Sequence, residues 1–234
     1  LQRAFFKADV IDLEVLSDHA IFATVYKLTK QFNVSYLLSG ENFETEAIMP
    51  TSWVWRKSDS VNIKDIHKLY GEKKLKTFPF MSTLKRLFYN KTGSAESIKV
   101  LNYLPYNKEK VMSILETEMG WRYYGGKHYE SIFTRFYQGY ILPKKFGIDK
   151  RKAHHSTLIN SAQMNRNDAI EDLKSEIYPT ELQNEDFELV CKKLNFSHNE
   201  LEDYIKRPGI AHEHYGTDKT LTDKIEKIYR FLKK

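Results

Sequence analysis

The feature that most constrains the fold is the segment from Val34 to Glu46, which reads VSYLLSGENFETE. It begins with a continuous apolar run of strand length that stops at Ser39 and Gly40. A run that is apolar on both faces is typical of a strand buried in a parallel sheet that helices cover on both sides. We therefore predict a central parallel strand over residues 34–39.

The polar residues after this strand are candidates for a functional loop. In open α/β sheets, ligands bind in the crevice outside the carboxyl ends of the strands, which is where residues 40–46 would lie. The loop carries the carboxylates Glu41 and Glu46, together with Asn42 and Thr45. An ordinary turn with solvated carboxylates fits this spacing equally well.

The segment before the strand is predicted to form a helix that packs on it. Asp18 is a suitable N-cap, and apolar residues recur at helical spacing through Phe32. A short connection around Asn33 would join helix to strand, as in an alternating α/β unit. Because the pattern after Asn107 is helical, we predict an α/β protein with a mainly helical carboxy-terminal half.

The composition excludes several classes of protein. With 41% hydrophobic and 14% aromatic residues over 234 positions, the chain can bury a core, which excludes a disordered protein. No apolar segment approaches the roughly 18 residues that cross a bilayer, so we expect a cytoplasmic protein without membrane insertion. The single cysteine, Cys191, excludes an internal disulfide and a cysteine-rich zinc site in these residues. We predict no metal-ligating residue.

Two neighbouring tryptophans are candidates for a stacking site. Trp53 and Trp55 lie beside Arg56 and Lys57, after the helix-breaking Pro50. Aromatic rings next to cations are suited to stack on a base or on a sugar ring. Packing of a long loop is the more common reason for such a pair, so both interpretations stay open.

A second informative segment, from Trp121 to Met164, interleaves glycine, aromatic and basic residues. Gly125 and Gly126 permit a close backbone approach, and a helix that contains Arg135 follows. The region 143–155 then holds five cations and one acid before two adjacent histidines: Lys144, Lys145, Asp149, Lys150, Arg151, Lys152, His154 and His155. Ammonium and guanidinium groups together are suited to phosphate or pyrophosphate, whereas the alternative is a solvated basic helix terminus.

These two segments would have to meet if they serve one site. We predict that Lys150, Arg151 and His154 fold back to within roughly 15 Å of residues 40–46, since functional atoms must converge on one ligand.

The chain resembles the carboxy-terminal two thirds of an N-acetyl sugar amidotransferase from bacterial lipopolysaccharide and surface-glycan biosynthesis. The resemblance runs from LQRAFFKADV through DHAIFATVYK, YLLSGENFETE, KDIHKLYG and LKTFP to KHYESIFTRFYQGYILPKKFGIDKRKAHHSTLINSAQMNR. It weakens beyond Glu176. The family comprises ATP pyrophosphatases with an adenine nucleotide alpha hydrolase-like, Rossmann-like fold, and these are relatives of asparagine synthetase and GMP synthetase.

The resemblance implies a ligase that uses ATP and Mg²⁺. It would convert the acetamido group of a nucleotide-linked sugar into an acetamidino group, with ammonia derived from glutamine. The implied partners are the nucleotide-linked N-acetyl sugar, a glutaminase subunit that supplies ammonia and a cyclase-like channel subunit, with no nucleic acid.

Roles for individual residues follow from the same resemblance. SGENFETE is similar to the SGE-containing loop of the asparagine synthetases, which implies that Glu41 accepts a proton near the activated carbon. The other implied catalytic residues are Lys150 and Arg151, which would stabilise the departing pyrophosphate. The implied contacts to the nucleotide are Gly40, Asn42, Lys127, Arg135 and His154, and the implied contacts to the sugar are Glu46, Trp53 and Trp55. For His154, a structural role fits equally well.

One departure from the family concerns the nucleotide. The family's SGGxDS phosphate loop and its upstream cysteine pairs are absent from these residues. Both would lie before Leu1, so we expect a truncated chain that is almost inactive alone. The predicted domains are a remnant of the ATP-pyrophosphatase domain (1–105), a helical substrate and anion region (106–178) and a helical appendage (179–234).

Two functions from other classes stay open. Basic clusters interleaved with Tyr, Phe and Trp, in a chain of net charge +6, are also typical of proteins that bind single-stranded nucleic acid. A catalytically silent partner subunit is the third possibility, because the phosphate loop is missing from these residues.

Overall fold

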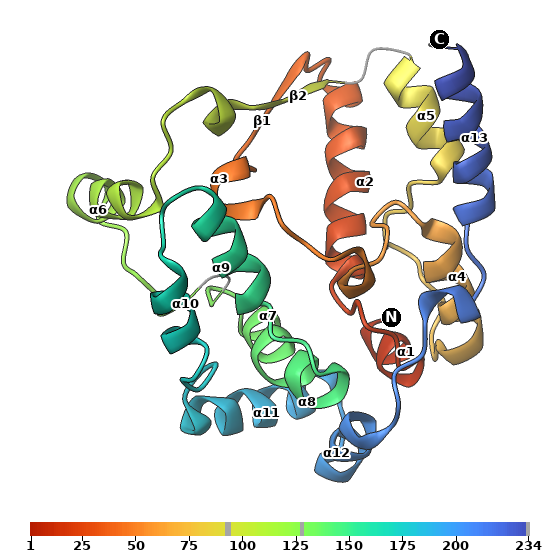
Figure 1. Ribbon diagram of the computed structural model, residues 1–234. Helices are drawn as coiled ribbons and strands as arrows, with labels where there is room; N and C mark the ends of the chain where they lie inside the picture. Colours follow the sequence, from red (N-terminus) through yellow and green to blue (C-terminus); the bar gives the residue numbers. More distant parts are fainter. Residues whose placement is uncertain (92–94, 127–128, 233–234) are drawn as a thin grey trace. The chain divides into compact units, whose positions relative to one another are not determined.

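The computed structural model describes residues 1–91, 95–126 and 129–232 (Figure 1). Most of this part of the chain is helical. Two short parallel strands, β1 (Tyr36–Ser39) and β2 (Glu96–Lys99), form the one sheet among the described residues. No described helix has both the length and the apolarity to cross a bilayer.

The prediction of a strand before Gly40 is confirmed, but the prediction that both of its faces are buried is wrong. Tyr36 and Leu38, on one face of β1, are 60% and 73% exposed. β1 pairs with β2 alone in the described part of the chain, so it is not a central strand of that sheet. The Rossmann-like fold therefore stays a prediction.

By packing, the chain divides into two compact units that are each built from separate segments. The first unit comprises residues 1–37, 54–96 and 207–234. Its helices are α1 (Gln2–Lys7), α2 (Val15–Gln31), α4 (Ser60–Tyr70), α5 (Thr83–Lys91), η4 (His212–His214) and α13 (Lys219–Leu232). The predicted domains 1–105, 106–178 and 179–234 describe functional regions, and they stay a prediction.

The core of the first unit forms where α1 packs on α4. Its fully buried side chains include Phe5, Phe6, Leu13, Ile63 and Ile66. α2 begins at Val15, earlier than the predicted cap at Asp18, so that cap prediction is wrong. Asp18 instead lies in the first turn, where its carboxylate pairs with Lys57 at 3.0 Å.

A buried polar network joins the three segments of the first unit. Asp12, which is 2% exposed, accepts hydrogen bonds from Lys57 Nζ (2.7 Å) and from the Trp55 N–H (2.8 Å). Its own N–H donates to Nε2 of His212 (3.4 Å). The proton of that imidazole therefore sits on Nδ1, which donates to Oδ1 of Asn62 (2.8 Å). Burial lowers the pKa of His212 to about 4, which keeps this ring neutral.

The second unit comprises residues 38–53 and 97–206. Its helical elements are α3 (Phe43–Glu46), η1 (Thr51–Trp53), η2 (Val100–Tyr103), α6 (Lys108–Met119), α7 (Ile132–Phe136), η3 (Tyr137–Ile141), α8 (Leu142–Phe146), α9 (Arg151–Asn160), α10 (Arg166–Asp172), α11 (Thr180–Leu194) and α12 (His198–Lys206). The predicted cap at Asn107 is confirmed, because its Oδ1 accepts the N–H of Lys110 at 3.0 Å.

α7, η3 and α8 follow one another without a break, and η3 is a π-helical turn. Pro143 lies just after that turn and has no N–H to donate to the carbonyl of Gly139, which favours a local departure from the α-helical pattern. Gly139 also lets Tyr178 approach, because a Cβ atom there would lie 2.4 Å from the ring of Tyr178. This helix supplies buried residues such as Phe136, Ile141 and Leu142 to the core of the second unit.

Candidate functional site

Contacts between α3 and α9 bring the two predicted segments together. Asn42 caps α3, since its Oδ1 accepts the N–H of Thr45 at 2.9 Å. The carbonyl of Thr45 accepts a hydrogen bond from Nδ1 of His154 (3.4 Å), and the carbonyl of Glu44 accepts one from the hydroxyl of Ser161 (2.8 Å). The predicted approach of His154 to the loop is therefore confirmed, across more than a hundred positions in the sequence.

A cavity of about 270 Å³, called here the first cavity, opens beside these contacts. Three groups of residues form its walls: the loop after β1, one face of α6 and an aromatic turn after α6. They are Gly40, Asn42, Thr45, Glu46, Tyr106, Lys108, Val111, Met112, Leu115, Trp121, Tyr123, Tyr124 and Gly126, with His154 from α9. The first cavity thus combines a carboxylate, two basic side chains, aromatic rings and an aliphatic wall.

A neighbouring cavity of about 390 Å³, the second cavity, shares Lys108, Tyr123, Gly126 and His154 with the first. Its other walls combine two cations and one histidine with three carboxylates, and they hold part of the predicted cationic segment. They include Tyr129, Asp149, Lys150, Arg151, His155, Asp172 and Glu176. Because the four shared residues border both spaces, the two cavities are neighbouring parts of one site.

Lys108 lies where the two cavities meet. Its Nζ is 3.5 Å from Nε2 of His154. Because a carbonyl only accepts, Nδ1 of His154 carries the proton that bonds to Thr45, and Nε2 then accepts from the ammonium of Lys108. The sequence did not mark Lys108 as a site residue. The feature that could have identified it is its helical spacing, which puts it on the same face of α6 as Val111 and Met112.

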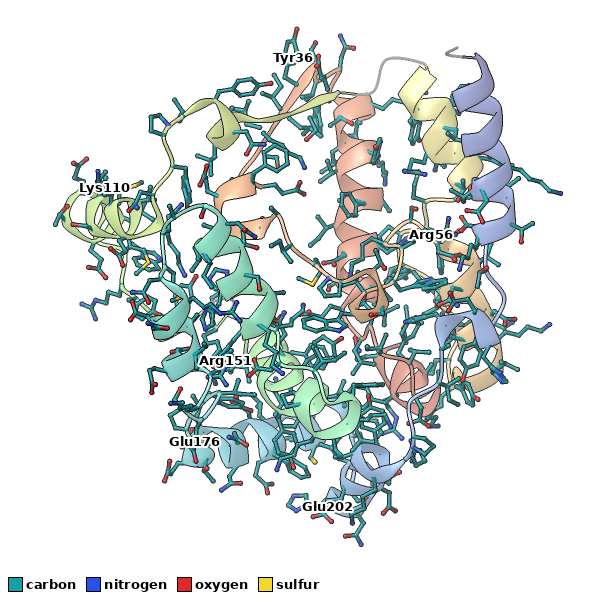
Figure 2. All side chains as sticks on the ribbon, in the orientation of Figure 1. Tyr36, Arg56, Lys110, Arg151, Glu176 and Glu202 are labelled. Atoms are coloured by element: carbon teal, nitrogen blue, oxygen red, sulfur yellow. The ribbon has the colours of Figure 1, made fainter. Side chains whose placement is uncertain are left out.

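The guanidinium of Arg151 is bonded to other parts of the protein. It binds the carboxylate of Asp149 (2.8 Å), the carbonyl of Asp172 (3.0 Å) and the carbonyl of Ser175 (3.3 Å). Figure 2 shows Arg151 at the start of α9. In this arrangement Arg151 holds α9 to the end of α10, and its predicted contact with pyrophosphate would require some of these bonds to break.

The buried side chain of His155 forms a pair with the half-exposed Asp172 that the sequence did not reveal. Its Nε2 lies 2.8 Å from Oδ2 of Asp172, and its buried Nδ1 has no hydrogen-bond partner. The ring is 7% exposed and borders the second cavity. Asp172 thus fixes the orientation of this imidazole.

The loop residues differ in their access to the site. Gly40, Asn42 and Glu46 line the first cavity, but Glu41 forms an exposed ion pair with Lys99 at 2.7 Å and is absent from both sets of lining residues. Burial, followed by the charge of Glu46, raises the pKa of Tyr106. Glu46 and Tyr106 both line the first cavity.

Other predicted residues lie away from these cavities or outside the described part of the chain. Arg135 forms two bonds of 2.7 Å with Asp186, which tie α7 to α11. The ring of Trp55 stacks on His212 at 4.8 Å in the first unit, so the packing interpretation is confirmed for this residue. Trp53 ends η1 and lines neither cavity. Lys127 lies outside the described residues.

The described residues do not form an evident metal site. No group of three His, Cys, Asp or Glu side chains in the described part of the chain is arranged to hold a metal ion. The ammonium groups of Lys108 and Lys150 border the second cavity and are suited to a phosphate group.

The geometry defines a helical unit with a small polar and aromatic site suited to a phosphorylated ligand. Residues 130–229 match the family model described as "LPS biosynthesis protein WbpG-like, C-terminal domain". The match covers less than half of the 234 residues and links this part of the chain to a family of lipopolysaccharide biosynthesis proteins. Searches of curated proteins and of solved structures gave no match.

Proposed function

We propose that this chain provides the sugar-binding side of an ATP-dependent N-acetyl sugar amidotransferase in lipopolysaccharide or surface-glycan biosynthesis. The observation that carries the proposal is the contact of His154 with the loop of residues 40–46. This contact brings together, at one cavity, the two segments that resemble the amidotransferase family. The family match to residues 130–229 supports the biosynthetic context.

The reaction replaces the oxygen of an acetamido group by nitrogen. An amide carbon is a poor electrophile, and ATP would supply the activation by adenylating the amide oxygen with release of pyrophosphate. Ammonia then adds to that carbon, AMP leaves, and the product is an acetamidinium group. The adding ammonia must lose a proton, so a carboxylate near the carbon assists this step.

Of the three loop carboxylates, Glu41, Glu44 and Glu46, Glu46 is the best placed proton acceptor. It lines the first cavity, whereas Glu41 lines neither cavity and is paired with Lys99. We therefore assign this role to Glu46, and the predicted role of Glu41 stays a prediction that the same experiments test.

The basic residues would hold the phosphates of the nucleotide-linked sugar. Lys108 and Lys150 border the second cavity, and Lys108 also borders the first. Ammonium groups in a partly enclosed site bind phosphate through charge-assisted hydrogen bonds. We assign no step to Mg²⁺.

The direct test is product formation by the full-length protein. Nucleotide-linked N-acetyl sugars are incubated with ATP and ammonium, and the products are analysed by mass spectrometry and by AMP and pyrophosphate release. We expect an acetamidino product with one AMP per turnover. Hydrolysis of ATP that leaves every acetamido group unchanged would contradict the proposal.

A further inference from the structure

We propose that the first cavity is the subsite for the N-acetylated sugar ring itself, with α6 and the aromatic turn Trp121–Tyr124 as its walls. The ligand's phosphates would then lie at Lys108, and its nucleoside in the second cavity. The class of ligand rests on the proposed function, and the position of the sugar ring is the new element.

The face of α6 that borders the first cavity is apolar. Val111, Met112 and Leu115 line the cavity and are only partly buried, and no residue of α6 is fully buried. Two turns further along the same face of the helix, Met119 is 74% exposed and lines neither cavity. The aliphatic face of α6 thus borders an open space and is not covered by a packed core. Such a face is suited to contact the methyl group of an acetamido substituent.

The aromatic turn provides a surface for the sugar ring. The ring of Trp121 packs edge-on to Tyr124 at 5.5 Å, and both border the first cavity. Tyr123 and Tyr124 remain 52% and 42% exposed. Aromatic rings of this kind contact the apolar C–H faces of a sugar, while hydroxyl groups bond to nearby polar side chains such as Glu46.

The size of the first cavity and the charge beside it determine which end of the ligand each cavity would hold. The volume of about 270 Å³ is near the lower end for ligand pockets, roughly 300–1,000 Å³, so the first cavity suits one ring better than a whole nucleotide. Lys108 borders both cavities beside His154, which places one positive charge between them. A diphosphate at this junction would leave the nucleoside in the larger second cavity, beside Tyr129.

Binding measurements with three probes test this assignment in the full-length protein. The probes are UDP-N-acetylglucosamine, UDP-glucose, which lacks the acetamido group, and UDP, which lacks the sugar. We expect Trp121→Ala to weaken binding of both sugar nucleotides about tenfold, with UDP binding unchanged. Trp121→Phe keeps an aromatic ring and should retain most of the affinity.

Two methionines of α6 form a matched pair for the acetamido group. Met112→Ala should weaken UDP-N-acetylglucosamine about fivefold and leave UDP-glucose nearly unchanged. Met119→Ala, at an exposed position two turns further along the same helix that lines neither cavity, should change neither. The assignment would be overturned if Trp121→Ala weakened binding of UDP as much as binding of the sugar nucleotides. It would also be overturned if Met112→Ala and Met119→Ala had equal effects on affinity, or if the protein bound none of the three probes.

The subsite and the proposed function can fail separately. Acetamidine formation that Trp121→Ala and Met112→Ala leave unchanged would refute the subsite and keep the function. The opposite result is that the protein forms no acetamidine but binds the sugar, and that these variants remove this binding. That result would support the subsite and refute the function.

Discussion

His154 and His155 are neighbours in the sequence but have different partners. Consecutive residues of an α-helix point about 100° apart, so His154 contacts Thr45 and Lys108 while His155 contacts Asp172. The sequence marked this pair as part of a basic segment. It did not show which histidine borders the loop, because that depends on what α9 packs against.

Lys108 offers a prediction at the scale of one side chain. Lys108→Gln should weaken binding of UDP about tenfold or more, because one charge-assisted hydrogen bond to phosphate is worth about 1.5–3 kcal/mol. The difference should shrink as salt concentration rises. Calorimetric titration measures both effects. Lys110→Gln is the matched control, because Lys110 is an exposed residue of the same helix; equal losses in the two variants would contradict a site at Lys108.

His212 predicts how the stability of the protein depends on pH. Burial lowers its pKa from 6.5 to about 4, so between these values the unfolded chain binds a proton that the folded protein does not. Above the unfolded pKa the imidazole is neutral in both states and costs nothing. The free energy of unfolding should therefore fall as pH drops from 6.5 to 4, by up to about 3 kcal/mol.

Urea unfolding at several pH values measures this effect. His212→Gln should lose most of this slope, whatever its absolute stability. His214→Gln, at an exposed position of the same turn, should keep the wild-type slope. A slope that survives in the His212 variant would show that another group is responsible.

At the scale of elements, local chemistry was predictable and tertiary surroundings were not. The cap at Asn107 and the strand before Gly40 follow from interactions within a few residues, and both are present. The exposure of β1 and the π-helical turn η3 depend on what lies against these segments. An apolar run indicates that a strand tolerates burial, but it does not say what covers it.

Gly139 tests the packing of η3. Gly139→Ala should destabilise the protein by about 1–3 kcal/mol, because the added Cβ would lie 2.4 Å from the ring of Tyr178. Urea unfolding measures the change. The penalty should shrink in a Tyr178→Leu background, where the ring is removed. Gly40→Ala is the control, since its Cβ would meet open space; similar losses at both glycines would contradict this account.

At the scale of the whole chain, long-range contacts define the units. Residues from Arg207 onward return to the first unit, where Arg207 pairs with Asp9 at 2.9 Å and the hydroxyl of Tyr215 donates to the carbonyl of Ala8 at 2.8 Å. No local sequence pattern indicates such long-range contacts, so we did not predict them from the sequence.

The candidate site was predictable in part. Residues 40–46 and His154 were identified from loop position, charge and the family resemblance, and they meet as expected. Lys108 and the role of the aromatic turn were missed, because they become visible only when one face of α6 is placed against the loop. Arg135 and Arg151 were selected for their charge, which does not distinguish a ligand contact from a structural ion pair.

The central claim is that the cavity beside residues 40–46 is where the acetamido carbon reacts. The most direct measurement compares Glu46→Gln and Glu41→Gln in the full-length protein, by ammonia-dependent formation of the acetamidino sugar. We expect Glu46→Gln to lower turnover on the order of 10²-fold or more with substrate affinity little changed, and Glu41→Gln to stay near wild type. Wild-type turnover in Glu46→Gln, with a large loss in Glu41→Gln, would contradict this account and restore the catalytic role to Glu41.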